Sequence, residues 1–149
     1  MSSVLAPVDG TVVGPAGVPD PVFRDELLGG GTAVEPSADA TEAVVLAPVG
    51  GTVAALHPHA FVVAPADGPG VLVHVGIDTV SLGGAGFTVH VAKGDAVDPG
   101  SPVLTVDLAA VRAAGLAATC PVVVLDSPAG SVSAPTGHTV RAGDELFRL

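Results

Sequence analysis

Three of the five histidines, His57, His59 and His74, flank one candidate β-hairpin. The segment between them contains Asp67-Gly68, a dipeptide that favours a two-residue hairpin turn. A turn there, or one residue earlier, makes His59 a diagonal or direct cross-strand neighbour of His74. Because side chains alternate between the two faces of a strand, either register places all three imidazoles on one face, provided that the loop has an even number of residues.

Two facing imidazoles are compatible with three kinds of site. A neutral imidazole is a nucleophile that forms covalent intermediates, and its neighbour can donate a hydrogen bond to the anion that results. The same pair, His59 and His74, could instead hold zinc through two nitrogens. The third interpretation is a pair of hydrogen-bonded side chains on a strand surface. Asp78 would share their face on a continuing strand, or would start a turn, and the spacing leaves these alternatives open.

The residues between these side chains predict an all-β fold of short strands. Twenty glycines and 14 prolines are spread along the chain and punctuate short runs that are rich in valine. Such runs favour strands, and many short strands favour a sandwich or barrel. The predicted strands are 43–46, 61–64, 71–77, 102–106 and 121–125. Only 107–118 is expected to be a helix, with Asp107 as its N-cap, and 25–28 is a candidate for one further helical turn.

Internal repeats predict a quasi-symmetric body. LAPVDGTVV at 5–13 recurs as LAPVGGTVAA at 46–55 and, weakly, as DSPAGSVSA at 126–134. Each copy is expected to form a strand, a turn and a strand. A second repeat relates 93–103 to 138–147, each with two short strands around a turn. No boundary divides the chain, so residues 1–149 are expected to be a single domain, with 36–41 as a loop.

Composition excludes several classes of protein. Fifteen acidic residues against five basic ones give a net charge of −10, which disfavours nucleic acids and anionic membrane surfaces as partners and suits a basic protein partner. The chain has no apolar run long enough to span a membrane, and its N-terminus lacks the features of a signal peptide. The one cysteine, Cys120, is expected to be buried and inert. These features predict a cytoplasmic location.

The sequence closely resembles the glucose-type IIA components of the bacterial phosphoenolpyruvate-dependent sugar phosphotransferase system. The resemblance covers nearly the whole chain, and its most specific segment is GVLVHVGIDTVSLGGAGF at 70–87. The other matching segments are LAPVDGTVV near the start, VPDPVF at 18–23, GGGTAVEP at 29–36, LAPVGGTV at 46–53, HAF at 59–61, GDAVDPGSPV at 94–103 and CPVVV at 120–124.

The resemblance implies a compact antiparallel β-sandwich and the activity of a phosphocarrier. It would accept a phosphoryl group from phospho-HPr, pass it to a cysteine of a IIB domain, and need no cofactor or metal. The resemblance implies that His74 is phosphorylated and that His59 is the second active-site histidine. It also implies partner-binding residues around the site, namely Asp20, Phe23, Phe61 and Asp78. Regulatory protein targets are a further implied class of partner, whereas the sugar contacts only the permease.

One departure from the family concerns His57, because related chains often carry threonine at this position to help fix the neighbouring imidazole. His57 either replaces that threonine or points into solvent. Two rival functions remain: a zinc-dependent hydrolase similar to the lysostaphin-type metallopeptidases, and a non-catalytic regulatory module. The metallopeptidases, however, have their ligand pairs in the reverse order along the chain. The identity of the sugar, with glucose and N-acetylglucosamine both plausible, is not encoded in these motifs.

Overall fold

The structure of the protein is a computed structural model, which describes residues 3–149. Residues 1 and 2 belong to the N-terminal segment for which no signal peptide is expected, and they lie outside the described residues. The elements in chain order are β1 (Ser3–Leu5), β2 (Gly10–Val12), the 3-10 helix η1 (Pro15–Gly17), α1 (Pro21–Arg24), β3 (Gly31–Glu35), β4 (Glu42–Leu46), β5 (Gly51–His57), β6 (Ala60–Ala64), β7 (Val71–His74), the 3-10 helix η2 (Thr79–Leu82), β8 (Phe87–Val89), β9 (Ala96–Val97), β10 (Pro102–Asp107), α2 (Leu108–Ala113), β11 (Cys120–Val124), β12 (Thr139–Val140) and β13 (Glu145–Arg148).

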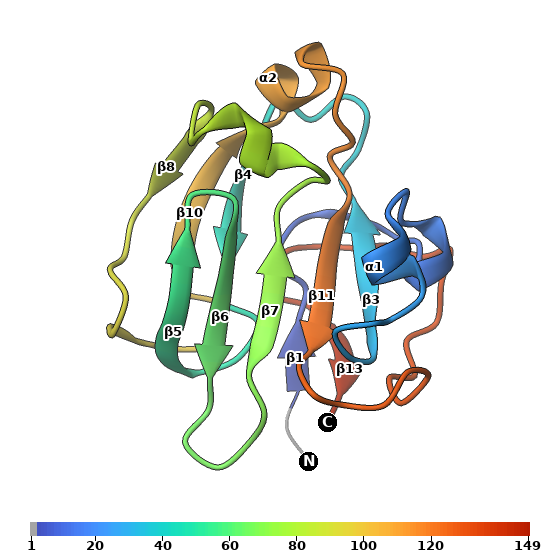
Figure 1. Ribbon diagram of the computed structural model, residues 1–149, viewed down its shortest axis with the longest axis vertical. Helices are drawn as coiled ribbons and strands as arrows, with labels where there is room; N and C mark the ends of the chain where they lie inside the picture. The colour runs from blue at the N-terminus through green and yellow to red at the C-terminus, as the bar shows by residue number, and fades with distance from the viewer. Residues whose placement is uncertain (1–2) are drawn as a thin grey trace.

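Within residues 3–149 the strands form three sheets, of two, three and eight strands. Their orders are β1-β13, β4-β10-β8 and β12-β2-β3-β11-β7-β6-β5-β9, and every pair is antiparallel. Figure 1 shows β5, β6, β7, β11 and β3 side by side in one layer, with β4 and β10 behind them. The predicted all-β antiparallel sandwich is therefore confirmed, and the sheets do not close into the flattened barrel that was its alternative.

The aliphatic core lies between the layers, and strand alternation decides which side chains enter it. On β7, Val71 and Val73 are fully buried, whereas Leu72 and His74 lie on the outer face and are partly exposed. This is the period of two that a pleated strand imposes. The strand ends at His74, earlier than the predicted run of 71–77, so this imidazole lies at the end of an interior strand, on the outer face of the sheet.

The two LAPV repeats lie side by side and form reciprocal backbone hydrogen bonds. The Leu5 amide donates to the Pro48 carbonyl at 2.8 Å, and the Leu46 amide donates to the Pro7 carbonyl at 2.9 Å. The strands that follow the repeats also pair in equivalent registers. Gly10 of β2 pairs with Val140 of β12, and the equivalent Gly51 of β5 pairs with Val97 of β9. The predicted quasi-symmetry is therefore present. Each turn, however, carries the chain from one sheet into another and does not close a hairpin.

Three local predictions need correction. The third repeat, 126–134, forms no strand; Asp126 adopts a left-handed φ of 60° and begins a turn. Helix α2 starts as predicted, with the Asp107 carboxylate accepting from the Ala110 amide at 2.9 Å, but it ends well before residue 118 because Gly115 has a φ of +80°. The single turn expected at 25–28 lies instead at α1, where Asp20 caps the helix.

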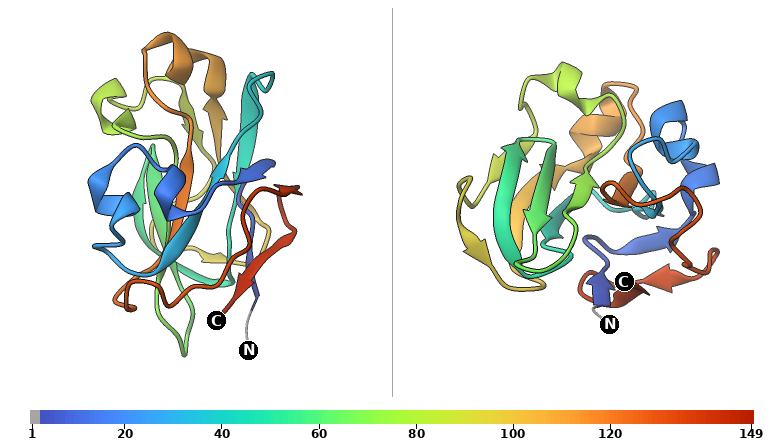
Figure 2. Two further views of the ribbon diagram at one scale, coloured as in Figure 1. Left: turned by 90° about the vertical axis from the view of Figure 1, so that its right-hand side faces the viewer. Right: turned by 60° about the horizontal axis from the view of Figure 1, so that its bottom comes forward.

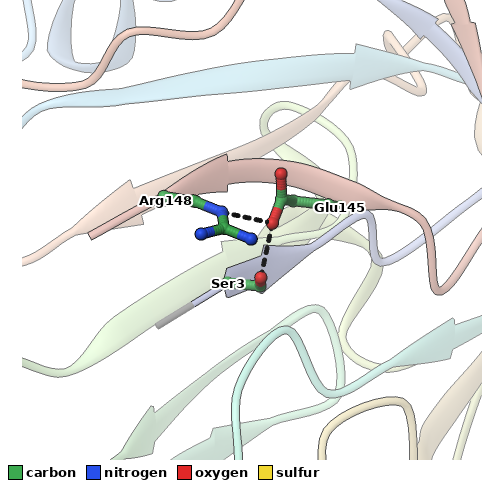
Figure 3. Close-up of polar contacts among 3 residues, drawn as sticks. All are labelled: Ser3, Glu145 and Arg148. Carbon is green, nitrogen blue, oxygen red and sulfur yellow. Dashed lines mark hydrogen bonds and ion pairs between the residues drawn. The ribbon is translucent and has the colours of Figure 1, made fainter. Parts of the chain in front are cut away.

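A polar contact joins the first and last strands. The Ser3 hydroxyl and the Arg148 Nε both donate to Oε1 of Glu145, at 2.5 and 2.8 Å (Figure 3). The hydrogen bonds from Ser3 and Arg148 lower the pKa of this carboxyl. The Glu145 and Arg148 side chains are exposed, so the contact is screened by water. Figure 2 shows β1 and β13 side by side, and Figure 1 places these two strands at the end of the molecule opposite α2.

The equivalent environments of the two LAPV repeats predict a matched pair of stability effects. Ala6 and Ala47 are equivalent residues of the two repeats, and both are completely buried. Replacing either by Val should overpack the core around it and lower the free energy of unfolding by about 1–3 kcal/mol. The control is Ala54→Val, at an exposed position of β5, which should change it by less than about 0.5 kcal/mol. Urea unfolding measures all three, and equal stabilities would contradict the prediction.

Candidate functional site

The three histidines meet at one end of the eight-stranded sheet. Ala60 is the cross-strand partner of both His57 on β5 and His74 on β7, so these two side chains share one row on the outer face. His59 lies between them in the two-residue turn that joins β5 to β6. Its ring centroid is 5.2 Å from that of His74, in an edge-to-face arrangement, and 5.8 Å from that of His57.

The predicted proximity of His59 and His74 is correct, but the predicted register is wrong. The pairing of β6 with β7 leaves residues 64–70, an odd number, between the last paired positions, and Ala60 therefore faces His74. His59 approaches from beyond the end of the strand. Its carbonyl accepts from the Val75 amide at 2.7 Å, which ties the turn to the chain that leaves β7.

A hydrogen bond determines which nitrogen of His74 carries the proton. Its Nδ1 lies 2.6 Å from the Gly76 carbonyl oxygen. A carbonyl can only accept, so Nδ1 must be the protonated donor, and Nε2 keeps its lone pair in the neutral ring. The carbonyl reaches back to the imidazole because Gly76 has a φ of +77°, a conformation that side chains other than glycine rarely adopt. The geometry thus leaves Nε2 as the nucleophilic atom.

Burial keeps the site neutral near pH 7. It lowers the pKa of His74 below its ordinary value of 6.5, against the opposing effects of the bond to Gly76 and the charges of Asp20 and Asp78. Burial also lowers the pKa of His59, and repulsion by His74, followed by that of His57, lowers it further. A neutral imidazole is the form that can act as a nucleophile.

Helix α1 brings an acid and an aromatic ring to His74. Asp20 caps the helix, its carboxylate accepting from the Val22 amide at 2.8 Å. One turn later, the Phe23 ring lies 5.1 Å from the His74 ring, tilted by 53°. Asp78, exposed and in a left-handed conformation with a φ of 60°, precedes η2 on the other side. The structure therefore brings together both predicted acids and one of the two predicted phenylalanines.

Phe61 does not belong to the exposed surround that was expected of it. Its side chain is 1% exposed and lies in the main core, because it faces inward on β6 beside its partner Val73. The exposed apolar residues on the flanking helices are instead Val22 on α1, at 38%, and Val80 on η2, at 66%. The sequence motifs did not indicate either valine, although Val22 is next to Phe23 and Val80 lies two residues after Asp78.

The zinc alternative would have to use His59 and His74 as its ligands. Among residues 3–149, no group of three His, Cys, Asp or Glu side chains is placed to hold one metal ion. His59 and His74 alone would supply two ligands, whereas zinc sites in proteins take three or four.

No helix within the described part of the chain is both long and apolar enough to cross a membrane.

The fold and the site together define a β-sandwich protein with a paired-histidine site at one end of the eight-stranded sheet, on its outer face. The family model of the phosphoenolpyruvate-dependent sugar phosphotransferase system, EIIA 1, matches residues 2–129. The chain therefore belongs to the EIIA family of this system and is a phosphocarrier component of sugar uptake.

Relatives and a solved structure agree with this assignment. The glucose-specific EIIA component of Bacillus anthracis is 35% identical over 144 residues, covering 95% of this chain and 85% of that protein. The glucose-specific EIICBA component of Streptococcus pneumoniae is 47% identical over 114 residues, 75% of this chain but only 15% of that longer protein. The glucose permease IIA structure from Mycoplasma capricolum superposes with a TM-score of 0.83 at 32% identity, covering 98% of this chain and 94% of that one.

The lowered pKa values predict a pH dependence. In NMR titrations, the His59 and His74 rings should both protonate below pH 6.5. Between the native and unfolded pKa values the unfolded chain binds more protons, so these residues should make the free energy of unfolding fall as the pH drops below about 6.5. In the His74→Ala variant, the pKa of His59 should rise towards its ordinary value, because a repelling charge is lost. Protonation of either ring above pH 6.5 in the wild type would contradict this.

Proposed function

We propose that His74 carries the phosphoryl group, on its Nε2 atom. The observation that supports this most directly is the 2.6 Å contact between Nδ1 and the Gly76 carbonyl, because it commits one nitrogen to donation and leaves the other as a nucleophile. The lowered pKa of His74 supports it further, since the ring is neutral under cellular conditions. Membership of the EIIA family implies that phospho-HPr is the phosphoryl donor and that a IIB domain is the acceptor.

The transfer consists of two displacements at phosphorus. The Nε2 lone pair of His74 attacks the phosphorus carried by a histidine of phospho-HPr; a new N–P bond forms, and the donor N–P bond breaks with its electron pair returning to the donor imidazole. In the second step the thiolate of a IIB cysteine attacks, an S–P bond forms, and the bond to His74 breaks. Such transition states are loose, so positioning and electrostatics provide most of the catalysis.

The neighbouring imidazoles have supporting roles in this proposal. His59, 5.2 Å from His74 between ring centroids, donates a hydrogen bond to the phosphoryl oxygens. Its pKa should rise once the dianionic group is bound, which would add a positive charge where it is needed. His57 is exposed, 5.8 Å from His59, and supports that ring in place of the threonine common among relatives.

The surroundings of His74 suit protein partners with basic surfaces. Asp20 and Asp78 act on His74 through their charges, and Phe23 lies against its ring. Val22 on α1 and Val80 on η2 are exposed apolar side chains on the flanking helices. We propose that phospho-HPr and a IIB domain dock on this face in turn, in the cytoplasm where the phosphoryl donor is produced. Relatives are named for glucose, β-glucosides or mannose, and we assign the choice of sugar to the permease partner.

Substitution of the histidines tests the proposal. His74→Ala should abolish labelling by phospho-HPr, whereas His59→Gln should still accept the group and pass it poorly to IIB, because the amide reaches the phosphoryl oxygens without the charge of an imidazolium. His57→Ala should slow transfer by more than about tenfold, or about 1.4 kcal/mol of barrier. Intact mass and rapid-quench measurements with phosphoenolpyruvate, enzyme I and HPr follow each variant.

The control is His90→Ala, since His90 lies outside the site and bonds to Thr105. Normal labelling of His74→Ala would show that the phosphoryl group resides elsewhere. Complete loss of acceptance in His59→Gln would assign the acceptor role, or an earlier step, to His59.

The acidic residues predict a dependence on salt. Asp20→Asn keeps a capping oxygen for α1, and Asn tolerates the left-handed backbone at position 78, so neither substitution should disturb the fold. Each should lower the association rate with HPr and flatten its dependence on ionic strength, because charges around an interface steer encounter. The control is Asp67→Asn, on the exposed β6–β7 loop at the opposite end of the sheet. Stopped-flow binding that is insensitive to salt in the wild type would contradict this.

A further inference from the structure

The peptide group between Val75 and Gly76 is held by side chains and not by a neighbouring strand. Its carbonyl, on Val75, accepts from the Thr79 hydroxyl at 2.7 Å in a fully buried environment. Thr79 is 1% exposed and is the first residue of η2. A buried carbonyl without a partner is costly, so this hydroxyl fixes the orientation of the peptide plane. The next carbonyl along the chain is that of Gly76, the acceptor for His74.

Thr79 also contacts Gly76 through its methyl group. A Cβ added at Gly76 would lie only 2.5 Å from the Thr79 Cγ2 atom, so the methyl fills the place that a side chain would take. The same Cβ would lie 3.0 Å from the Ala117 carbonyl oxygen on the far side. Gly76 is therefore enclosed, and its φ of +77° is held from both directions.

The segment at Gly76 and Ile77 has two further neighbours, Ala117 and Cys120. The Ile77 amide donates to the Ala117 carbonyl at 3.0 Å. Cys120 is fully buried; burial raises the pKa of its thiol to about 12, and the backbone of Gly76 opposes that rise. The sulfur is therefore a neutral thiol, and it donates to the Ala118 carbonyl at 3.3 Å. Of the contacts around this turn, the Thr79 hydroxyl bond is the one that a single isosteric substitution can remove.

We propose that Thr79 is a positioning residue that selects the tautomer of His74. Its hydroxyl anchors the Val75–Gly76 peptide, the Gly76 carbonyl then faces Nδ1, and the proton is held there so that Nε2 stays available. The functional consequence rests on the proposed role of His74 as phosphoacceptor. The structural part, the control of the tautomer, does not.

The test compares Thr79→Val with Thr79→Ser. Valine has the shape of threonine but no hydroxyl, so the Gly76 carbonyl should lose its fixed orientation. NMR of the ring nitrogens in unphosphorylated protein should then show a mixture of tautomers in place of a single Nδ1-protonated form. Serine keeps the hydroxyl and should keep the Nδ1-protonated form. With phospho-HPr, the valine variant should accept the group about tenfold more slowly, and part of the product should carry phosphorus on Nδ1.

A matched control lies on the same helix. The Ser81 hydroxyl donates to the Asp78 carbonyl at 2.8 Å, but it does not touch the Val75–Gly76 peptide. Ser81→Ala therefore removes a comparable hydrogen bond and should leave the tautomer unchanged. Gly76→Ala and Gly83→Ala form a second pair: both glycines have a positive φ, but only Gly76 is enclosed, and only Gly76→Ala should shift the tautomer.

The outcomes separate this proposal from its alternatives. A Thr79→Val variant that keeps the single Nδ1-protonated form overturns it, even if the protein is less stable, because Thr79 would then have a structural role only. If Thr79→Val does not fold, Thr79→Ser decides: loss of the Nδ1-protonated form despite the retained hydroxyl overturns the proposal, and retention supports it. Normal labelling of His74→Ala would remove the proposed phosphoacceptor while leaving the tautomer measurement intact.

Discussion

The hydrogen bond from Nδ1 of His74 to the Gly76 carbonyl is the interaction on which the site depends. An imidazole has two nitrogens, and only the one that lacks a proton can act as a nucleophile. A carbonyl at 2.6 Å removes that ambiguity without placing a charge beside the ring. A carboxylate in the same position would also accept from Nδ1, but it would raise the pKa of the imidazole and repel an incoming phosphoryl group. A backbone acceptor therefore suits the proposed role of His74, which requires a neutral ring before transfer and release of the phosphoryl group afterwards.

The sandwich supplies the rigid frame that this bond requires. His74 lies at the last position of β7, where alternation turns it to the outer face while Val73 anchors the strand in the core. The reciprocal bonds between the LAPV repeats join the segment that follows β1 to the segment that follows β4, outside the eight-stranded sheet. Helix α1 packs beside it and sets Phe23 against the imidazole. Burial by these neighbours keeps the ring neutral, and the nearby acids Asp20 and Asp78 moderate that effect.

Several features of the protein could be predicted from the sequence because their causes are local. Short valine-rich runs between turn residues specify strands, and Asp107 specifies the start of α2 through a bond to an amide three residues away. The repeated LAPV segments indicated quasi-symmetry, which the matched registers confirm. The motifs around His59 and His74 identified the family, because their order along the chain is highly specific. Strand content, capping and family membership thus required no knowledge of which segments meet in space.

Tertiary structure alone decided how those segments meet. Phe61 follows the turn that carries His59, and only the pairing of β6 with β7 shows that it enters the core. The register depended on whether the loop at 64–70 was odd or even in length, a property that the dipeptide Asp67-Gly68 does not determine. The third repeat, at 126–134, forms no strands, because Asp126 adopts a left-handed conformation in the turn where the chain leaves β11. The tautomer of His74 depends in turn on a glycine enclosed by Thr79 and Ala117. A strand's propensity arises from its own residues, but its register, its buried face and its contacts are determined by partners that are distant in the sequence.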